Sequence, residues 1–350
     1  MTMSDTPKPL PEDDLEAIAS SAAVGWPLFR GARVFLTGGT GFFGRWLVES
    51  FVAANERHHL GASLTVLSRD PERFLARAPH VARAREIDFV TGDVRSFAFP
   101  SGAFTHVVHA AASSDARLYR ERTAQMVDTI FDGTRRVLDF AQACGAKRLL
   151  FVSSGAVYGP QPPTLSHLHE TFAGEPNPLD ATTSYACAKR SAERLCELYR
   201  VETVVARAFA FVGPLLPLDQ HFAVGNFLAD ALAGRAVQVA GDGTPLRSYL
   251  YASDLATWLW ALAARGASGR AYNVGSDRAV SIAELARLVS RLVGTGEVKV
   301  AKRAPPRAPA ARYVPSVERA KSELGLSGTV SLEDAILRTA AWYREDRPGA

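Results

Sequence analysis

The sequence predicts an α/β protein built on a doubly wound parallel sheet, with a second, smaller α/β domain. Three observations predict this fold. A glycine-rich turn near residue 38 joins a strand pattern to a helix pattern, strand and helix patterns alternate from there to residue 213, and shorter elements follow. Because neighbouring parallel strands need a long crossover, this alternation is typical of a parallel sheet with helices on both faces.

These patterns divide the chain into three parts. Residues 1–30 are an N-terminal extension, in which residues 13–23 are expected to form a helix and Trp26, Leu28 and Phe29 to pack on the core. The other two parts are each assembled from two stretches. They are a dinucleotide-binding domain of residues 31–213 plus 251–275, and a substrate-binding domain of residues 214–250 plus 276–350.

The composition is that of an ordinary globular protein, with 47% hydrophobic and 22% charged residues among 350. The net charge of +4 is too small and dispersed to favour nucleic acid or a membrane surface as partner. Without an 18-residue apolar run or a signal-peptide pattern, no transmembrane helix or export is expected. Three cysteines without a C-x-x-C pair indicate a reducing compartment and no metal, so we expect a cytoplasmic location.

The glycine-rich turn is the element that predicts a cofactor. A strand at 33–37 runs into a G-x-x-G-x-x-G spacing, then into a helix with apolar residues at helical spacing, and a strand at 64–67 completes a βαβ unit. Glycine lets a pyrophosphate approach the backbone, and the helix N-terminus offers it unpaired N–H groups. The unit therefore predicts a Rossmann dinucleotide site. The cofactor contacts expected in this turn are Gly38, Thr40, Gly41, Phe42, Phe43 and Gly44.

The end of the second strand decides which dinucleotide is expected. NAD sites usually place a carboxylate there, on the ribose 2′-hydroxyl, but here Ser68 and Arg69 follow the strand. Asp70 precedes a proline and matches a helix N-cap. Because a guanidinium fits phosphate oxygens, Arg69 beside a hydroxyl favours the 2′-phosphate of NADP. NAD stays the alternative, with Asp70 on the ribose and Arg69 stacked on adenine.

Further strands are expected over 86–90, 105–111, 148–152 and 202–211, and residues 271–275 return to the same sheet. At the carboxyl edge of a parallel sheet, small residues let a flat cofactor approach, which adds Ala110 and Ala111 to the expected contacts. His109 lies within its strand and is interpreted as a packed residue rather than a catalyst. His167, His169 and Glu170 lie in a proline-rich loop without a further ligand motif, so no metal is expected.

Two helices carry the next signals. Residues 120–144 form a long amphipathic pattern that ends at Gly145, and Thr182 opens a helix that carries Tyr185 and Lys189. Four residues apart, these side chains share one helix face about 6 Å apart. Lowering a tyrosine pKa from near 10 to about 7 needs roughly 4 kcal/mol. A cation about 4 Å away supplies an interaction of that order at an effective dielectric of about 20.

Ser154, at the tip of the neighbouring strand, adds a hydroxyl that can bond the oxygen of a carbonyl or carbinol while Tyr185 transfers a proton. We therefore predict Ser154, Tyr185 and Lys189 as a catalytic set for hydride chemistry that a nicotinamide supplies. Lys189 is also expected to contact the cofactor, and Ser154 and Tyr185 the substrate.

With these motifs the sequence resembles the extended short-chain dehydrogenase/reductases that act on nucleotide sugars, the NAD-dependent epimerase/dehydratase group. The resemblance runs from about Arg33 to Leu324. It is carried by Thr37–Gly44, Gly92–Val94, His109–Ala111, Ser153–Gly159, Tyr185–Lys189, Arg207–Pro214 and Gly241–Asp254.

The resemblance implies roles for single residues. It favours Ser154 over Ser153 as the catalytic serine, assigns Asp93 to adenine, with Val94 beside it, and assigns Arg247 to the substrate diphosphate. Ser113 and Asn226 are further expected substrate contacts. The family commonly dimerises through two helices from each subunit, so we also expect a homodimer through the helices at 120–144 and 182–200.

Two departures from the family pattern narrow the reaction. Ala210 stands where the family usually has an asparagine in the substrate loop. Dehydratases of the family carry an Asp-Glu pair after the catalytic threonine, whereas Gly155 and Ala156 follow Ser154 here. The first expectation is therefore an NADPH-dependent 4-keto-sugar reductase. The alternatives are a nucleotide-sugar 4-epimerase with tightly bound NAD and, more remotely, a non-catalytic cofactor-binding regulator.

Overall fold

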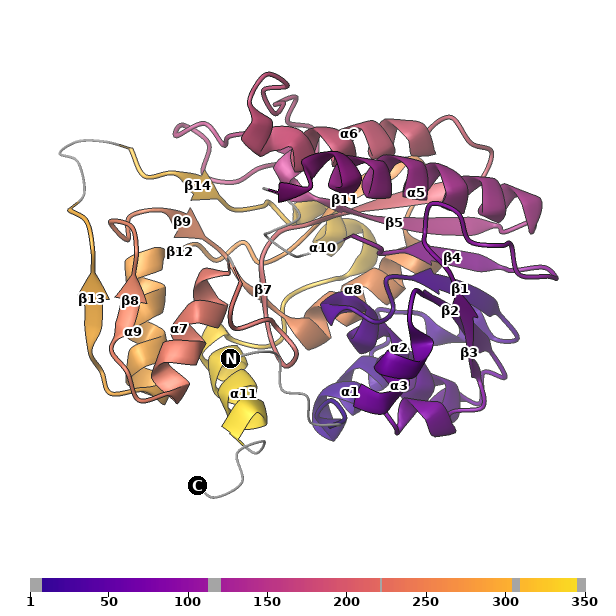
Figure 1. Ribbon diagram of the computed structural model, residues 1–350, viewed down its shortest axis with the longest axis horizontal. Coiled ribbons are helices and arrows are strands. Elements are labelled where there is room, and N and C mark those ends of the chain that lie inside the picture. Colours follow the sequence, from indigo (N-terminus) through magenta and orange to yellow (C-terminus); the bar gives the residue numbers. More distant parts are fainter. Residues whose placement is uncertain (1–7, 113–120, 221, 304–308, 345–350) are drawn as a thin grey trace.

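A computed structural model describes residues 8–112, 121–220, 222–303 and 309–344, and its centre is a sheet of seven parallel strands in the order β11-β6-β5-β4-β1-β2-β3 (Figure 1). This is the doubly wound sheet that the sequence predicts. Its strands are β1 (Arg33–Thr37), β2 (Ser63–Ser68), β3 (Ile87–Thr91), β4 (His106–His109), β5 (Arg148–Ser154), β6 (Glu202–Ala208) and β11 (Arg270–Val274).

Helices cover both faces of this sheet. On one face α5 (Thr123–Ala143) packs beside α6 (Ser184–Cys196), above β4 and β5 in Figure 1. On the other face lie α2 (Phe42–His58) and α8 (Ala252–Arg265), and α3 (Pro71–Arg77) flanks β3. The strand order reverses between β1 and β4, so the carboxyl ends of these two strands open a crevice for a ligand.

Two predicted strands end earlier than expected. The strand predicted over 105–111 stops at His109, because the next two backbone N–H groups turn to Thr37 and brace the glycine turn. The strand predicted over 202–211 stops at Ala208. After two intervening residues, β7 (Phe211–Val212) pairs instead with β10 (Leu250–Tyr251), outside the seven-stranded sheet. These breaks place loops, rather than strands, at the crevice.

The later stretches of the chain build a smaller body at one end of the sheet (Figure 1). A three-stranded sheet in the order β12-β9-β14 faces the crevice, and β8 pairs in parallel with β13. Helices α7, α9 and α11 pack together there, while α10 packs on β11. The elements are α7 (Ala223–Leu232), β8 (Val237–Val239), β9 (Leu246–Arg247), β12 (Val280–Ser281), α9 (Ile282–Val293), β13 (Val298–Val300), β14 (Arg312–Tyr313), α10 (Glu318–Leu324) and α11 (Leu332–Arg344).

The N-terminal extension is part of the fold. Helix α1 (Glu12–Ser20) packs on α2 and α8, and the buried ring of Trp26 stands 5.6 Å from that of Trp260 in α8. Asp14, 1% exposed, accepts hydrogen bonds from Tyr251 (2.5 Å) and Arg338 (2.7 Å). Phe29 is buried as expected. Leu28 is 58% exposed, and its predicted core packing is wrong because the turn of Trp26–Phe29 points it outward.

Candidate active site

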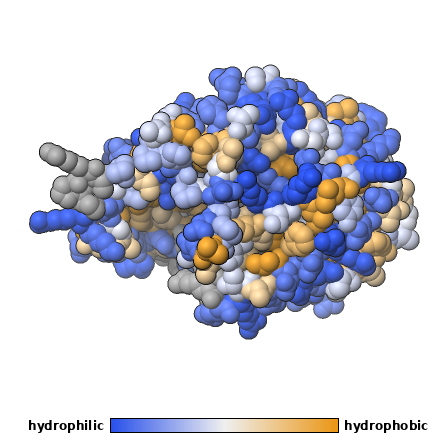
Figure 2. All heavy atoms as spheres, turned by 90° about the horizontal axis from the view of Figure 1, so that it is seen from above, coloured by the Kyte–Doolittle hydropathy of each residue, from blue (hydrophilic) through white to orange (hydrophobic). Residues whose placement is uncertain are grey.

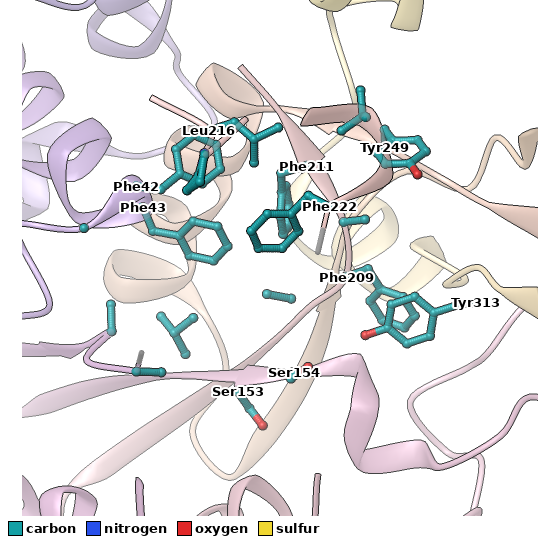
Figure 3. A pocket seen from close by; sticks show the side chains of 18 of the residues that line it. Phe42, Phe43, Ser153, Ser154, Phe209, Phe211, Leu216, Phe222, Tyr249 and Tyr313 are labelled. Atoms are coloured by element: carbon teal, nitrogen blue, oxygen red, sulfur yellow. The ribbon is translucent and has the colours of Figure 1, made fainter. Parts of the chain in front are cut away.

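A cavity of about 560 Å³ lies at the carboxyl edge of the sheet, between the glycine turn and the smaller body. Its walls are largely apolar, and Figure 3 shows Phe43, Phe211 and Phe222 gathered on one side, opposite Ser154. Among the described residues that line it, Lys189 and Arg247 are the charged ones, and no carboxylate lines it. The cavity therefore favours an anionic ligand with a large apolar or ring-shaped part.

The glycine turn has the shape that a pyrophosphate requires. A Cβ on Gly38, whose φ is +77°, would lie 2.6 Å from the backbone of Ala110, and one on Gly44 would lie 2.0 Å from the carbonyl oxygen of Gly38. A Cβ on Gly41 would meet no protein atom nearer than 3.5 Å. Helix α2 starts here without a side-chain cap, so its N-terminal N–H groups face the cavity. These residues fit a dinucleotide cofactor.

His109 is buried and hydrogen-bonded beneath this turn. Its ring nitrogens lie 2.7 Å from Thr37 Oγ1 and 3.1 Å from Thr134 Oγ1. Burial, aided by the charge of Lys189, lowers the pKa of His109 to about 3, so the ring stays neutral. The interpretation of His109 as a packed residue agrees with this geometry.

The residues predicted for the adenosine end lie together beyond the cavity. Ser68 is buried, and its hydroxyl accepts a hydrogen bond from the N–H of Asp70 (3.2 Å). Asp70 caps α3 by accepting from the N–H of Arg73 at 3.0 Å, which is the predicted N-cap role. Arg69 is exposed. In the sequence, Asp70 is the first carboxylate after the end of β2.

Asp93 lies close to Arg69 and is already engaged. Its carboxylate accepts two side-chain hydrogen bonds from Arg95, at 2.8 and 3.0 Å. These bonds hold the pKa of Asp93 below its usual value, and the charge of Arg69 adds to the effect. Val94 packs on α5 at Gly133, and Thr40 lies exposed in the turn outside the cavity wall.

The three predicted catalytic residues line one wall of the cavity. Ser154 ends β5, and its hydroxyl accepts from the N–H of Ala156 (3.2 Å). Tyr185 and Lys189 project from the same face of α6. Lys189 is 2% exposed and donates to the carbonyl of Val152 (2.7 Å). Burial lowers the pKa of Lys189 to about 8, so the ammonium is mostly charged at neutral pH.

A half-buried ion pair between Glu193 and Arg207 was not among the predicted site residues. Glu193, one helical turn after Lys189, accepts from Arg207 Nη2 (2.7 Å) and from the hydroxyl of Ser153 (2.5 Å). Both Ser153 and Ser154 line the cavity, but this contact commits the Ser153 hydroxyl to Glu193 of α6. The spacing of Glu193 after Lys189 was the one signal in the sequence, and it does not reveal the partner on β6.

The predicted substrate contacts are placed unevenly. Arg247 lines the cavity from β9. Asn226 is exposed on α7 and does not line the cavity, because its neighbours Phe222, Ala223 and Val224 take that position. Ser113 lies outside the described residues.

In the proline-rich loop with His167, His169 and Glu170, the His167 ring hydrogen-bonds the carbonyl of Asp277 (2.9 Å). The described residues hold no group of three metal-ligating side chains.

The sequence pattern of the NAD dependent epimerase/dehydratase family matches residues 34–275. The chain belongs to this family. Among its relatives, UDP-glucuronic acid decarboxylase 1 of Xenopus tropicalis is 29% identical over 319 residues, 90% of this chain and 72% of that protein. UDP-glucuronic acid decarboxylase 6 of Arabidopsis thaliana is 28% identical over 311 residues, 87% of this chain and 86% of that protein.

Solved structures agree with the family assignment. The UDP-glucose 4-epimerase of Thermus thermophilus, solved in complex with NAD, is 26% identical, with a TM-score of 0.71 over 89% of this chain and 99% of that one. The family is NAD-dependent, so the chain belongs to a family of cofactor-using enzymes. Among the helices that the structure describes, none combines the length and apolarity needed to cross a membrane.

Proposed function

We propose that this member of the family is an oxidoreductase that acts on a keto carbon of a nucleotide-diphosphate sugar, with NADPH as the expected reductant. The observation that carries the proposal is the shared cavity. The glycine turn, the Ser154–Tyr185–Lys189 wall and Arg247 all line it, and Lys189 and Arg247 are its charged groups in the described chain. Lys189 lies next to the catalytic tyrosine, and Arg247 lies on the smaller body. This arrangement suits a substrate that has a reacting sugar at one end and a diphosphate at the other.

In this reaction a bound nicotinamide dinucleotide supplies the hydride. Tyr185 gives its proton to the sugar oxygen, and Lys189 stabilises the negative charge that the phenol oxygen acquires. Ser154 donates a hydrogen bond to the same sugar oxygen as charge develops there. Lys189 keeps its position because its ammonium is fixed on the carbonyl of Val152.

The cavity disfavours two other reactions of such sugars. Elimination of water needs an acid and a base beside the reacting carbon, and Gly155 and Ala156 supply neither. A sugar with a carboxylate would need a cation of its own. If Arg247 binds the diphosphate and Lys189 serves Tyr185, no charged lining residue in the described chain remains for it. This argues against the decarboxylase activity named for the sequence relatives.

A 4-epimerase with tightly held NAD is the second candidate. Such an enzyme oxidises and re-reduces one carbon with the same three residues, and the solved relative from Thermus thermophilus is a 4-epimerase with NAD bound.

The cytoplasmic location also stays a prediction.

One experiment separates these activities. The protein is incubated with a panel of nucleotide sugars and their 4-keto derivatives, while NADPH absorbance is followed and products are identified by NMR. Stoichiometric NADPH oxidation with a 4-keto sugar supports the reductase. Interconversion without net oxidation indicates the epimerase, and loss of carbon dioxide from a uronic acid indicates a decarboxylase. Binding of NADPH without any turnover would contradict the proposal and favour the regulator.

Arg69→Ala is expected to weaken NADP binding about tenfold or more and to leave NAD binding nearly unchanged. A charge-assisted hydrogen bond to a phosphate contributes roughly 1.5–3 kcal/mol, and Asp70 is held by its capping role. The measurement is the ratio of the two dissociation constants by calorimetry. Arg85→Ala is the control. This arginine is also exposed, but it precedes β3 at the amino end of the strands, whereas Arg69 follows β2 at their carboxyl end. An unchanged ratio would exclude Arg69 as a phosphate ligand and favour the epimerase.

We also propose that the protein forms a homodimer through α5 and α6. Figure 2 looks onto this side of the molecule and shows hydrophobic residues grouped within a largely hydrophilic surface. Val127 and Phe131 of α5 are half-buried, and Leu198 after α6 is 65% exposed. Symmetric dimers are the commonest oligomers. Analytical ultracentrifugation at micromolar concentration should give the mass of two chains, and a monomer mass would contradict the proposal.

A further inference from the structure

Tyr313, like Tyr185 and Tyr249, is a tyrosine of the cavity wall, and the sequence did not single it out. It lies on β14, in register with Arg247 on the neighbouring strand β9. Its ring packs on Phe209 with centroids 4.6 Å apart and planes tilted by 33°. In Figure 3 its hydroxyl points from the smaller body toward Ser154. A residue of the last third of the chain therefore reaches the catalytic wall.

The space beside Gly155 shows how close this approach is. A Cβ on Gly155 would lie 2.7 Å from the Tyr313 hydroxyl oxygen and 2.7 Å from the ring of Phe209. Gly155 directly follows Ser154, so the aromatic pair fills the place where a side chain after the catalytic serine would stand. Glycine at this position is the condition for Tyr313 to reach the serine.

The phenol of Tyr313 keeps its proton and can therefore act as a hydrogen-bond donor. Burial raises the pKa of Tyr313, and this outweighs the opposite effects of a hydrogen-bond interaction with the Ser154 side chain and of the charge of Arg247. The phenol is therefore protonated at neutral pH. Tyr313 can donate a hydrogen bond throughout the reaction, whereas Tyr185 gives up its proton.

We propose that Tyr313 is a positioning residue that donates a hydrogen bond to Ser154 Oγ and so directs the Ser154 proton to the reacting sugar oxygen. A serine hydroxyl has one proton and two acceptor lone pairs. The N–H of Ala156 takes one lone pair (3.2 Å), and Tyr313 takes the other. The Ser154 proton then has the substrate oxygen as its acceptor. An oxygen that gains negative charge can only accept hydrogen bonds. The hydrogen bonds therefore run in one direction, with Tyr313 donating to Ser154 and Ser154 donating to the substrate oxygen.

This inference rests on the proposed function for its kinetic consequence. Tyr313 acts where charge develops on the sugar oxygen, so its hydroxyl should affect kcat more than KM. Tyr313→Phe keeps the ring and its packing on Phe209 and removes the hydroxyl. We expect kcat to fall about tenfold, the size of one hydrogen bond, with KM for the sugar nucleotide within about twofold.

A double-mutant cycle tests the route through Ser154. In a Ser154→Ala background, Tyr313→Phe should cause no further loss of kcat, because the hydroxyl that it orients is gone. Tyr249→Phe is the control, since Tyr249 lines the same cavity from another position, and it should change kcat by the same factor in both backgrounds. An equal loss from Tyr313→Phe in both backgrounds, or no loss in wild type, would overturn the proposal.

A second measurement does not depend on turnover. With 3-fluorotyrosine at position 313, the fluorine NMR signal should move when Ser154→Ala is introduced and move much less with Ser153→Ala, whose hydroxyl bonds Glu193. Equal or absent shifts would overturn the inference. If no nucleotide sugar is turned over but the Ser154-specific shift is seen, the proposed function fails and the hydrogen bond from Tyr313 stands.

Discussion

Tyr185→Phe is expected to lower turnover by at least about 10²-fold while cofactor affinity is kept. The change removes the hydroxyl that transfers the proton and leaves a ring of the same shape on α6. The buried Lys189 remains fixed on Val152, so the wall keeps its geometry. Steady-state kinetics with the substrate found in the panel, together with a fluorescence titration of the dinucleotide, measures both quantities.

Tyr199→Phe is the matched control for this variant. Tyr199 lies just beyond the end of α6, where its hydroxyl donates to Asp139 (2.7 Å), and it does not line the cavity. Its loss should leave turnover unchanged. Turnover of Tyr185→Phe close to that of the wild type would remove Tyr185 from its role as proton donor.

Gly44→Ala is expected to damage both stability and cofactor binding, whereas Gly41→Ala should affect binding alone. A Cβ on Gly44 would stand 2.0 Å from the carbonyl oxygen of Gly38 and 2.4 Å from Gly39 Cα, so the backbone of the turn has to move. Overpacking of this kind costs about 1–3 kcal/mol or more. Because the displaced turn is the proposed binding site of the phosphates, we expect dinucleotide affinity to fall by at least about 10².

Gly41→Ala is the matched comparison for Gly44→Ala, because both glycines belong to the same turn. A Cβ on Gly41 would stay 3.5 Å from the carbonyl oxygen of Gly38, and Gly41 lines the cavity where we propose that the pyrophosphate binds. We expect an unchanged Tm and a loss of affinity of about tenfold or more, or about 1.4 kcal/mol. Thermal unfolding and calorimetry measure the two effects. Normal dinucleotide affinity in Gly41→Ala would place the phosphates elsewhere.

Features that depend on short stretches could be predicted from the sequence. The βαβ unit around Gly38, the cap at Asp70 and the shared helix face of Tyr185 and Lys189 are set by neighbours within a few residues. Strand ends were harder, because they depend on distant partners. The expected strand to Phe211 breaks after Ala208, since Phe211 pairs with Leu250 of β10.

The candidate site was predicted unevenly for the same physical reason. Residues of the glycine turn and α6 can be recognised by their spacing in the sequence. Tyr313 instead reaches the space beside Gly155 through the pairing of β14 with β9, which no local pattern shows. Likewise, nothing local in the sequence shows that Glu193 holds Arg207 and Ser153. For Asn226, helix geometry decides the outcome: α7 presents Ala223 and Val224 to the cavity and Asn226 to solvent.

The side-chain contacts of Asp14 join helix α1 to helix α11, so the two helices are expected to unfold together. Its one carboxylate holds Tyr251 of β10 and Arg338 of α11. The first and last described helices are thus joined through a residue that is 1% exposed. Terminal helices usually open by local fraying, with fast exchange of their amide protons. Here opening of α11 must break a contact with α1, so amide protons of the two helices should exchange with deuterium as one cooperative unit.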